Sequence, residues 1–319
     1  ASLDEPDKRQ FGSAWAPYFE DPDIPGFHGP FTAADAVTIG FLQRTWKKIE
    51  EDSKQFAGDL KLPFEQWDGY EGYVKVGLFS DSVDRRFDQE IFSHNELSGG
   101  DPDNYIGGWD EYWSDVFATE NHVIEDTGKA IDYDGEQKIG AWYGMIDLPL
   151  HEQFKVITGA RVESTEITTV NTPASDQAFY FPPGAAAPVI LANNPGGADA
   201  NFSQDDVLPS IAVVAGPYED LTIRASYSQT VARQTFKELT PIVQQEFLGG
   251  PIFIGNPKLG MSALTNYDLR FDVRPDEGSL YSVSWFYKDV EDPIEYVQRV
   301  EALTFTEPVN YPEGRLSGF

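Results

Sequence analysis

The chain has 319 residues, no cysteine, 53 acidic against 23 basic residues, and a formal net charge of −30 at pH 7. This composition excludes disulfides and thiolate metal sites, and so acidic a balance argues against a nucleic-acid-binding surface, which must neutralise phosphates. No apolar run approaches the roughly 18–20 residues of a membrane helix.

Alternation of apolar and polar residues predicts a series of β-strands along the chain. Residues 39–53 fit either an amphipathic helix or the first part of a strand, and the strand is preferred from Arg44 onward. About nine runs follow in chain order: 55–64, 73–92, 137–148, 154–170, 206–215, 221–236, 264–274, 279–298 and one that begins near Arg315. Soluble strands are typically about five or six residues long, whereas these runs reach the roughly 9–11 residues of a tilted membrane strand.

The alternation separates each run into an apolar and a polar face. Tyr267, Phe271, Val283 and Trp285 lie on apolar faces, and Asp268 lies on a polar one. An arginine facing lipid at the bilayer midplane costs roughly 2–4 kcal/mol, so the polar faces are predicted to line a wet lumen. The predicted lumen-facing residues are Arg161, Glu163, Arg224, Asp268, Arg270 and Asp272.

The connections between the runs are of two kinds. Short turns are predicted at 66–72, 149–153, 216–220 and 274–278, and long loops at 94–136, 171–204, 237–263 and 301–314. Structureless loops this long would count against a compact soluble domain. Short turns alternating with long loops are instead typical of outer-membrane barrels, whose periplasmic turns are short and whose extracellular loops are long.

Four motifs, in order, resemble the barrel of TonB-dependent receptors over about residues 206–319. They are the strand motif 224–233 followed by Phe236, Glu238 and Leu239, the loop-to-strand motif 255–259 with 265–269, the strand motif 284–290 with 293–295, and the strand start 315–319. Upstream, 61–64 and 75–79 are also similar. Gln234 stands where the family usually has proline, and Gly260-Met261 replaces the usual Lys-Pro.

The resemblance implies a transmembrane, antiparallel, all-β barrel of 22 strands in the bacterial outer membrane, occluded by a plug and powered by the TonB complex. Residues 1–319 are then expected to be a partial barrel domain of about nine strands, with the plug domain and the C-terminal strands absent. The expected partners are TonB through that plug, a small-molecule or oligosaccharide ligand, and outer-membrane lipid and lipopolysaccharide. The lumen charges would pair across strands or contact the plug, in preference to substrate.

No motif for catalysis or metal binding stands out. The four histidines are scattered, without metal-ligand spacing, and there is no nucleophile elbow, phosphate loop or dinucleotide fingerprint. We therefore expect no catalytic residue, no metal, no cofactor and no enzyme activity.

One segment, 101–136, combines aromatic and acidic residues in a predicted loop. Its aromatic rings can stack on a sugar ring or pack on one another, and its carboxylates can accept hydrogen bonds from hydroxyl groups or hold Ca²⁺. The candidate substrate-binding residues are Tyr105, Trp109, Tyr112 and Trp113.

The predicted function is TonB-dependent uptake of a scarce nutrient such as an oligosaccharide or a ferric siderophore. A passive outer-membrane porin is one alternative, which a plug domain encoded upstream would exclude. A soluble, secreted, β-rich carbohydrate-binding protein is the other, and it would be monodisperse without detergent.

Overall fold

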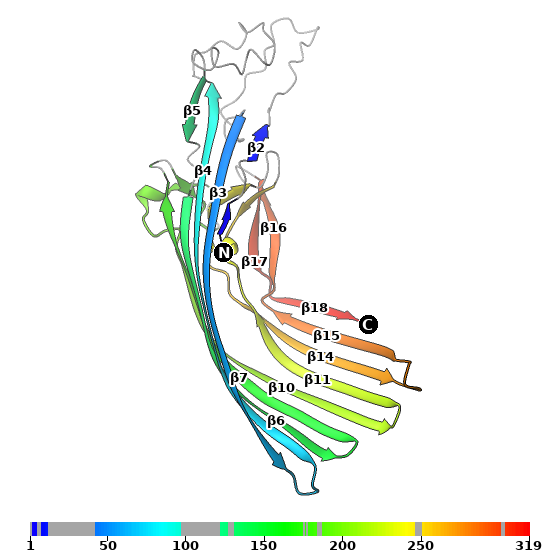
Figure 1. The fold of residues 1–319 in the computed structure, drawn as a ribbon. Helices are drawn as coiled ribbons and strands as arrows, with labels where there is room; N and C mark the ends of the chain where they lie inside the picture. Colours follow the sequence, from blue (N-terminus) through cyan, green and yellow to red (C-terminus); the bar gives the residue numbers. More distant parts are fainter. Residues whose placement is uncertain are drawn as a thin grey trace, which may run out of the picture.

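A single antiparallel sheet dominates the computed structural model, which describes residues 2–4, 8–11, 42–96, 122–126, 131–174, 176, 178–183, 187–245, 251–300 and 304–319. Nine main strands follow one another across this sheet in chain order, as Figure 1 shows. They are β3 (Leu42–Glu65), β4 (Glu71–Glu96), β6 (Ile131–His151), β7 (Phe154–Pro173), β10 (Ala200–Tyr218), β11 (Leu221–Ala232), β14 (Ser262–Val273), β15 (Tyr281–Glu291) and β18 (Glu313–Gly318). Short strands β1 (Ser2–Asp4) and β2 (Lys8–Phe11) pair with β3, and β5 (His122–Asp126) pairs with β4. The expectation of an antiparallel, all-β fold is confirmed.

The strands differ greatly in length. β3 and β4 have 24 and 26 residues, whereas β14 and β15 have 12 and 11. The residues from Arg44 onward are strand, as preferred, and the tight turns predicted after β3, β6, β10 and β14 are present. The first five main strands therefore form a tall wall that rises far above the rest of the sheet (Figure 1).

Two predicted runs are interrupted, which corrects their extents. The run 221–236 stops at Ala232 and is followed by the short helix α4 (Phe236–Leu239). The run 279–298 divides at Asp292, whose φ of 51° places it in the left-handed region. Its second part is β16 (Ile294–Val300), which belongs to another sheet. In both runs the alternation already fades near the break, because Arg233 and Thr235 follow Val231 on the apolar face of the first run, and Asp289 and Glu291 follow Tyr287 on that of the second.

The described residues of three predicted loops fold into a compact structure, which we call the cap (171–174, 176, 178–183, 187–199, 233–245, 251–261, 292–300 and 304–310). It holds α4, β8 (Phe179–Tyr180), β9 (Val189–Ile190), the 3₁₀ helix η2 (Leu191–Asn193), β12 (Val243–Gln245), β13 (Ile252–Ile254), β16 and β17 (Thr304–Asn310). β12, β13, β17 and β16 form a four-stranded sheet. The predicted long connections are present and carry secondary structure of their own, because these segments bury one another's apolar side chains.

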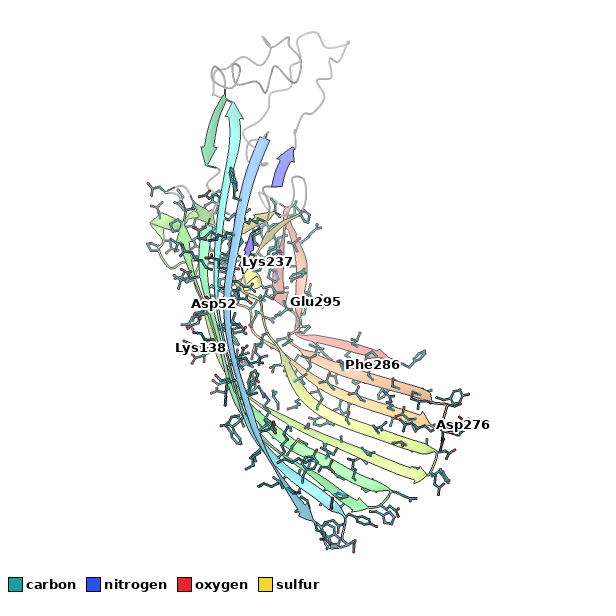
Figure 2. The ribbon with its side chains drawn as sticks, viewed as in Figure 1. Asp52, Lys138, Lys237, Asp276, Phe286 and Glu295 are labelled. Atoms are coloured by element: carbon teal, nitrogen blue, oxygen red, sulfur yellow. The ribbon has the colours of Figure 1, made fainter. Side chains whose placement is uncertain are left out.

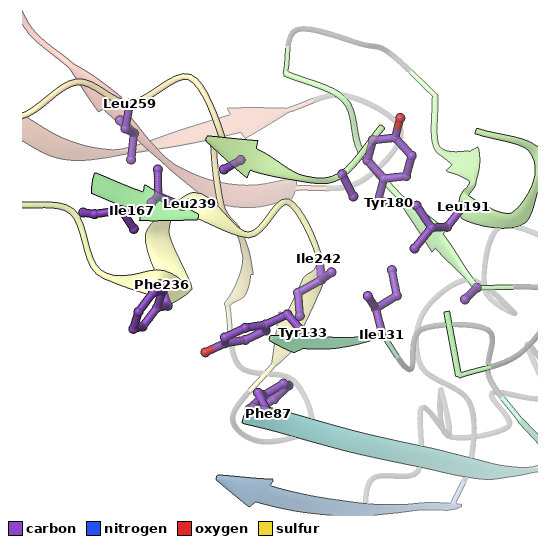
Figure 3. Packing of buried hydrophobic residues seen from close by; sticks show 13 residues of the cluster. Phe87, Ile131, Tyr133, Ile167, Tyr180, Leu191, Phe236, Leu239, Ile242 and Leu259 are labelled. Carbon is purple, nitrogen blue, oxygen red and sulfur yellow. The ribbon is translucent and has the colours of Figure 1, made fainter. Parts of the chain in front are cut away.

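A hydrophobic core joins the cap to the tall strands. Phe236, Leu239 and Ile242 of the cap pack with Phe87 and Tyr133 of the wall in one buried cluster (Figure 3). The rings of Phe87 and Tyr133 stack at 5.1 Å between centroids. We call the face that carries these wall residues the inner face, and the opposite one the outer face.

The two faces exchange polarity halfway up the wall. Lys54, Ser82 and Lys138 are neighbours across β3, β4 and β6 on the outer face, and we call them the crossover row. Below this row the outer face is apolar and exposed, as in Leu78 and Trp142 (62% and 58% exposed). Above it the outer face is charged, and the inner face becomes the buried apolar surface beneath the cap.

This exchange marks where the environment of the sheet changes. The lower outer face bears its apolar residues from Phe56 to Phe64 of β3, roughly 27 Å of strand. That length fits the apolar band of about 25 Å in transmembrane barrels. The tall strands therefore have a lipid-compatible lower part and a water-compatible upper part.

Candidate functional site: charged clusters on the inner face

All six residues predicted to face the lumen lie on the inner face. Arg161 and Glu163 lie on β7, Arg224 on β11, and the other three (Asp268, Arg270 and Asp272) on β14. The register places Arg224 beside Arg270 and Thr222 beside Asp272, whereas Tyr267 and Phe271 point to the outer face. Within the inner face the charged residues form two separate clusters.

The lower cluster surrounds Asp272 near the short turns. Asp272 forms an ion pair with Arg224, and the Arg270 Nε donates a hydrogen bond to its Oδ1 at 2.8 Å. The Ser282 Oγ donates to the same oxygen at 2.6 Å. Charge-assisted bonds of this kind are stronger than neutral ones, so Asp272 ties β11, β14 and β15 together.

The upper cluster lies where the sheet meets the cap. Glu163, whose side chain is 5% exposed, forms ion pairs with both Arg161 and Arg233. The Arg233 Nε also donates to the Thr165 Oγ1 at 3.2 Å, and the Arg161 guanidinium lies 4.9 Å from the centroid of the Phe79 ring. One carboxylate thus pairs with two guanidinium groups on the inner face, and these three side chains together carry one net positive charge.

Arg233 was not among the predicted site residues. It follows the end of β11 and precedes α4, so it connects the sheet to the cap. The one available sign in the sequence is its position at the end of the strand motif 224–233. Alternation along β11 does not show that the chain leaves the strand after Ala232, and so it does not predict that the Arg233 side chain contacts β7.

α4 begins with a capping box, and its side chains form part of the cap surface. Thr235 and Glu238 satisfy each other's backbone N–H groups, as in S/T-x-x-E boxes. The Tyr296 hydroxyl of β16 donates to the Glu238 Oε1 at 2.7 Å, and burial together with this bond raises the pKa of Tyr296 to about 12. Phe253 packs edge-on against Tyr296 at 5.6 Å, with the Lys237 Nζ 4.8 Å from the centroid of the Phe253 ring. These contacts fix an aromatic, charged surface on the cap.

The predicted ligand-contacting residues Tyr105, Trp109, Tyr112 and Trp113 lie outside the described residues. Of the segment 101–136, the structure describes β5 and the start of β6. In the described part of the chain, no three His, Asp or Glu side chains are placed to hold a metal ion. Among the same residues, no helix has the length and apolarity to cross a membrane.

The inner face therefore offers a polar, charged surface below a folded cap. Its carboxylates are held by arginines and hydroxyl groups. Such an arrangement can line a wet passage and can hold the cap in place.

The sequence matches the family model described as TonB dependent receptor-like, beta-barrel over residues 4–319. A search of curated proteins found no match. Among solved structures, the copper transporter OprC is 14% identical with a TM-score of 0.50, over 88% of this chain and 36% of that one. The alcaligin outer-membrane receptor FauA from Bordetella pertussis is 14% identical with a TM-score of 0.44, over 84% and 35%.

The ferric yersiniabactin uptake receptor FyuA from Yersinia pestis is 12% identical with a TM-score of 0.46, over 79% of this chain and 30% of that one. At these sequence identities, the structural similarity shows the fold and nothing about function. The chain spans 30–36% of the length of these three structures.

Proposed function

The chain belongs to the TonB dependent receptor-like β-barrel family, and from this we propose that it forms part of a receptor that imports a scarce nutrient across the bacterial outer membrane. Receptors of this family are transporters and not enzymes. We propose that residues 1–319 contribute about nine strands to the barrel domain. The remaining strands, and the plug through which TonB acts, are then supplied by other parts of the receptor.

The exchange of polarity at the crossover row is the observation that carries this proposal. An exposed apolar band below the row suits lipid, and charged residues above it suit water and lipopolysaccharide. Large exposed apolar patches are rare on soluble monomers, which disfavours the soluble carbohydrate-binding alternative. The passive porin remains the rival, because it would share the same band.

Uptake by the full-length receptor should depend on TonB. Cells that carry the receptor and a functional TonB complex are expected to accumulate a labelled oligosaccharide or ferric siderophore, and cells without TonB are expected to lose that accumulation. A passive porin would conduct equally in both strains. Measured uptake that persists at full rate without TonB would therefore assign the chain to a porin.

The cargo is proposed from the segment 101–136. Its aromatic and acidic side chains suit a hydroxyl-rich ligand, with an oligosaccharide preferred and a ferric siderophore as the alternative. In the same uptake assay, changing Trp109 and Trp113 to alanine should weaken ligand binding. Unchanged uptake by that folded variant would remove these residues from the site.

A charged residue introduced on the outer face, within the apolar band, should destabilise the barrel more than one introduced at the same level on the inner face. Ile211 and Ala212 are adjacent in β10 and point to opposite faces, with Ile211 exposed near the middle of the apolar band. Ile211→Arg should destabilise the membrane-inserted barrel by roughly 2–4 kcal/mol, and Ala212→Arg should cost less. The check is the amount and the heat resistance of folded full-length receptor in outer membranes. Equal losses for both variants would contradict the assignment of faces.

A further inference from the structure

The four-stranded sheet of the cap has one buried face and one that is largely exposed. Val243, Ile254 and Phe305 share the first face and pack against Phe181 in a buried cluster. The side chains that alternate with them form the second, which we call the open face. Its accessible or partly accessible residues include Phe253, Tyr296, Gln298, Val300, Thr304 and Thr306.

The open face is free of charge in a chain that is rich in it. None of the described residues that the register of the four strands places on this face is charged, although charged residues make up 24% of the chain. Glu295 is exposed and next to Tyr296 in β16, but it points to the opposite face. Figure 2 shows Glu295 and Lys237 at the level of the cap. α4 brings Lys237 and Glu238 to this face, where they contact the ring of Phe253 and the hydroxyl of Tyr296.

The ring of Tyr296 is accessible and yet held in place. Its side chain belongs to a residue that is 60% exposed, while its hydroxyl donates to the Glu238 Oε1 at 2.7 Å. Phe253 meets the same ring edge-on at 5.6 Å between centroids. A ring fixed in this way loses little conformational freedom when a ligand packs on it, which lowers the cost of binding.

Hydrogen-bonding groups without charge lie next to this ring. Gln298 follows two residues after Tyr296 on the same face of β16, and its register partner in β17 is Thr306. An amide and a hydroxyl group can each both donate and accept hydrogen bonds. The open face therefore offers an aromatic platform beside neutral donors and acceptors.

We propose that the open face binds a neutral oligosaccharide, with one sugar ring stacked on Tyr296 and its hydroxyl groups bonded to Gln298 and Thr306. An aromatic ring with amide and hydroxyl groups beside it supplies the apolar and the polar contacts that a sugar ring offers in return. A ferric siderophore that carries negative charge would find no cation among the described strand residues of this face to balance it.

This site rests on the proposed function and narrows its cargo from two candidates to the oligosaccharide. It adds a contact on the cap to the one proposed in the segment 101–136.

The binding test uses purified full-length receptor and an array of immobilised neutral and acidic oligosaccharides. At least one neutral oligosaccharide should bind, and Tyr296→Ala should weaken that binding about ten-fold or more, because the stacking ring is lost. Tyr296→Phe keeps the ring and should stay within about three-fold of the parent protein. Gln298→Ala should weaken binding about three-fold or more. Glu295→Gln, on the opposite face of the same strand, is the matched control and should change nothing.

Tyr296→Ala also removes the hydrogen bond to Glu238, so the state of its cap is measured by limited proteolysis. If the cap opens in that variant, the result is taken from Gln298→Ala and Thr306→Ala, which leave the contacts of α4 unchanged. An array on which no neutral oligosaccharide binds, or binding that none of these variants weakens, overturns the proposal.

The proposed function is separated from this site by the uptake assay. A ferric siderophore that is accumulated with TonB, while no neutral oligosaccharide binds, would overturn the site and leave the proposed function in place. Oligosaccharide binding that Tyr296→Ala weakens, together with uptake that persists without TonB, would support the site and overturn the proposed function.

Discussion

Changing Phe236 to alanine is expected to release α4 from the wall and open the cap while the sheet stays folded. Phe236 is 6% exposed and fills the space left by Gly135, where a Cβ would meet its ring at 2.6 Å. The Arg85 guanidinium lies 5.2 Å from the centroid of the same ring. Truncating a buried phenylalanine costs about 3–5 kcal/mol, and here that loss falls on the contact between cap and wall.

Limited proteolysis of the full-length receptor measures this local opening. If cleavage of the cap follows its open population, the rate should rise by roughly two to four orders of magnitude. The Phe236→Leu variant keeps an apolar side chain, so its rate of cap cleavage should lie between those of the parent protein and the Phe236→Ala variant. Val300→Ala, at a cap residue that is 79% exposed, should match the parent protein. An intact cap in the Phe236→Ala variant would show that the small cap sheet docks without α4.

The placement of side chains on the two faces followed from the sequence because alternation is a local property of a strand. Tyr267 and Asp268 are neighbours in β14, and a slip of one residue would exchange their faces. The tight turns then fixed which runs pair, because antiparallel strands joined by a short connection are neighbours. No long-range information was needed for this part.

The exchange of polarity is also present in the sequence, but a prediction that assigns one apolar face to a whole run does not detect it. In β4, Val76 and Leu78 are followed on the same face by Asp84 and Arg86. Splitting the run at Ser82 would have located the edge of the apolar band. Alternation with a period of two shows which residues share a face, but it does not show whether lipid, water or protein covers that face.

The cap could not be predicted, because its core joins residues from distant segments. Tyr180, Leu239 and Tyr133 belong to one buried cluster, yet they come from three separate connections or strands. Each segment alone is short and weakly patterned. The partner of Glu163 was missed for the same reason, since Arg233 reaches β7 only when β11 stops and the chain turns into α4.

Changing Glu163 to glutamine is expected to destabilise the contact between the sheet and the cap. Its carboxylate is nearly buried, and the guanidinium groups of Arg161 and Arg233 both depend on it. Removing one partner of a buried ion pair typically costs 3–5 kcal/mol, because the remaining charge stays desolvated. The arginine side chains are 30% and 24% exposed, so water screens part of this loss. We expect Glu163→Gln to cost about 3 kcal/mol, at the lower end of that range.

This loss of stability should open the cap before it unfolds the sheet, because Arg233 connects the cap to the sheet and pairs with Glu163. Thermal unfolding and cap proteolysis of full-length receptor should both report it, whereas Asp268→Asn, at an exposed inner-face carboxylate, should change stability by less than about 0.5 kcal/mol.

Combining Glu163→Gln with Arg161→Gln removes a positive charge as well, so the double variant should be more stable than the sum of the two single changes predicts. That excess is the coupling energy of the pair. Strict additivity would mean that Arg161 is held by its contact with Phe79 and that its ion pair with the Glu163 carboxylate adds nothing to stability.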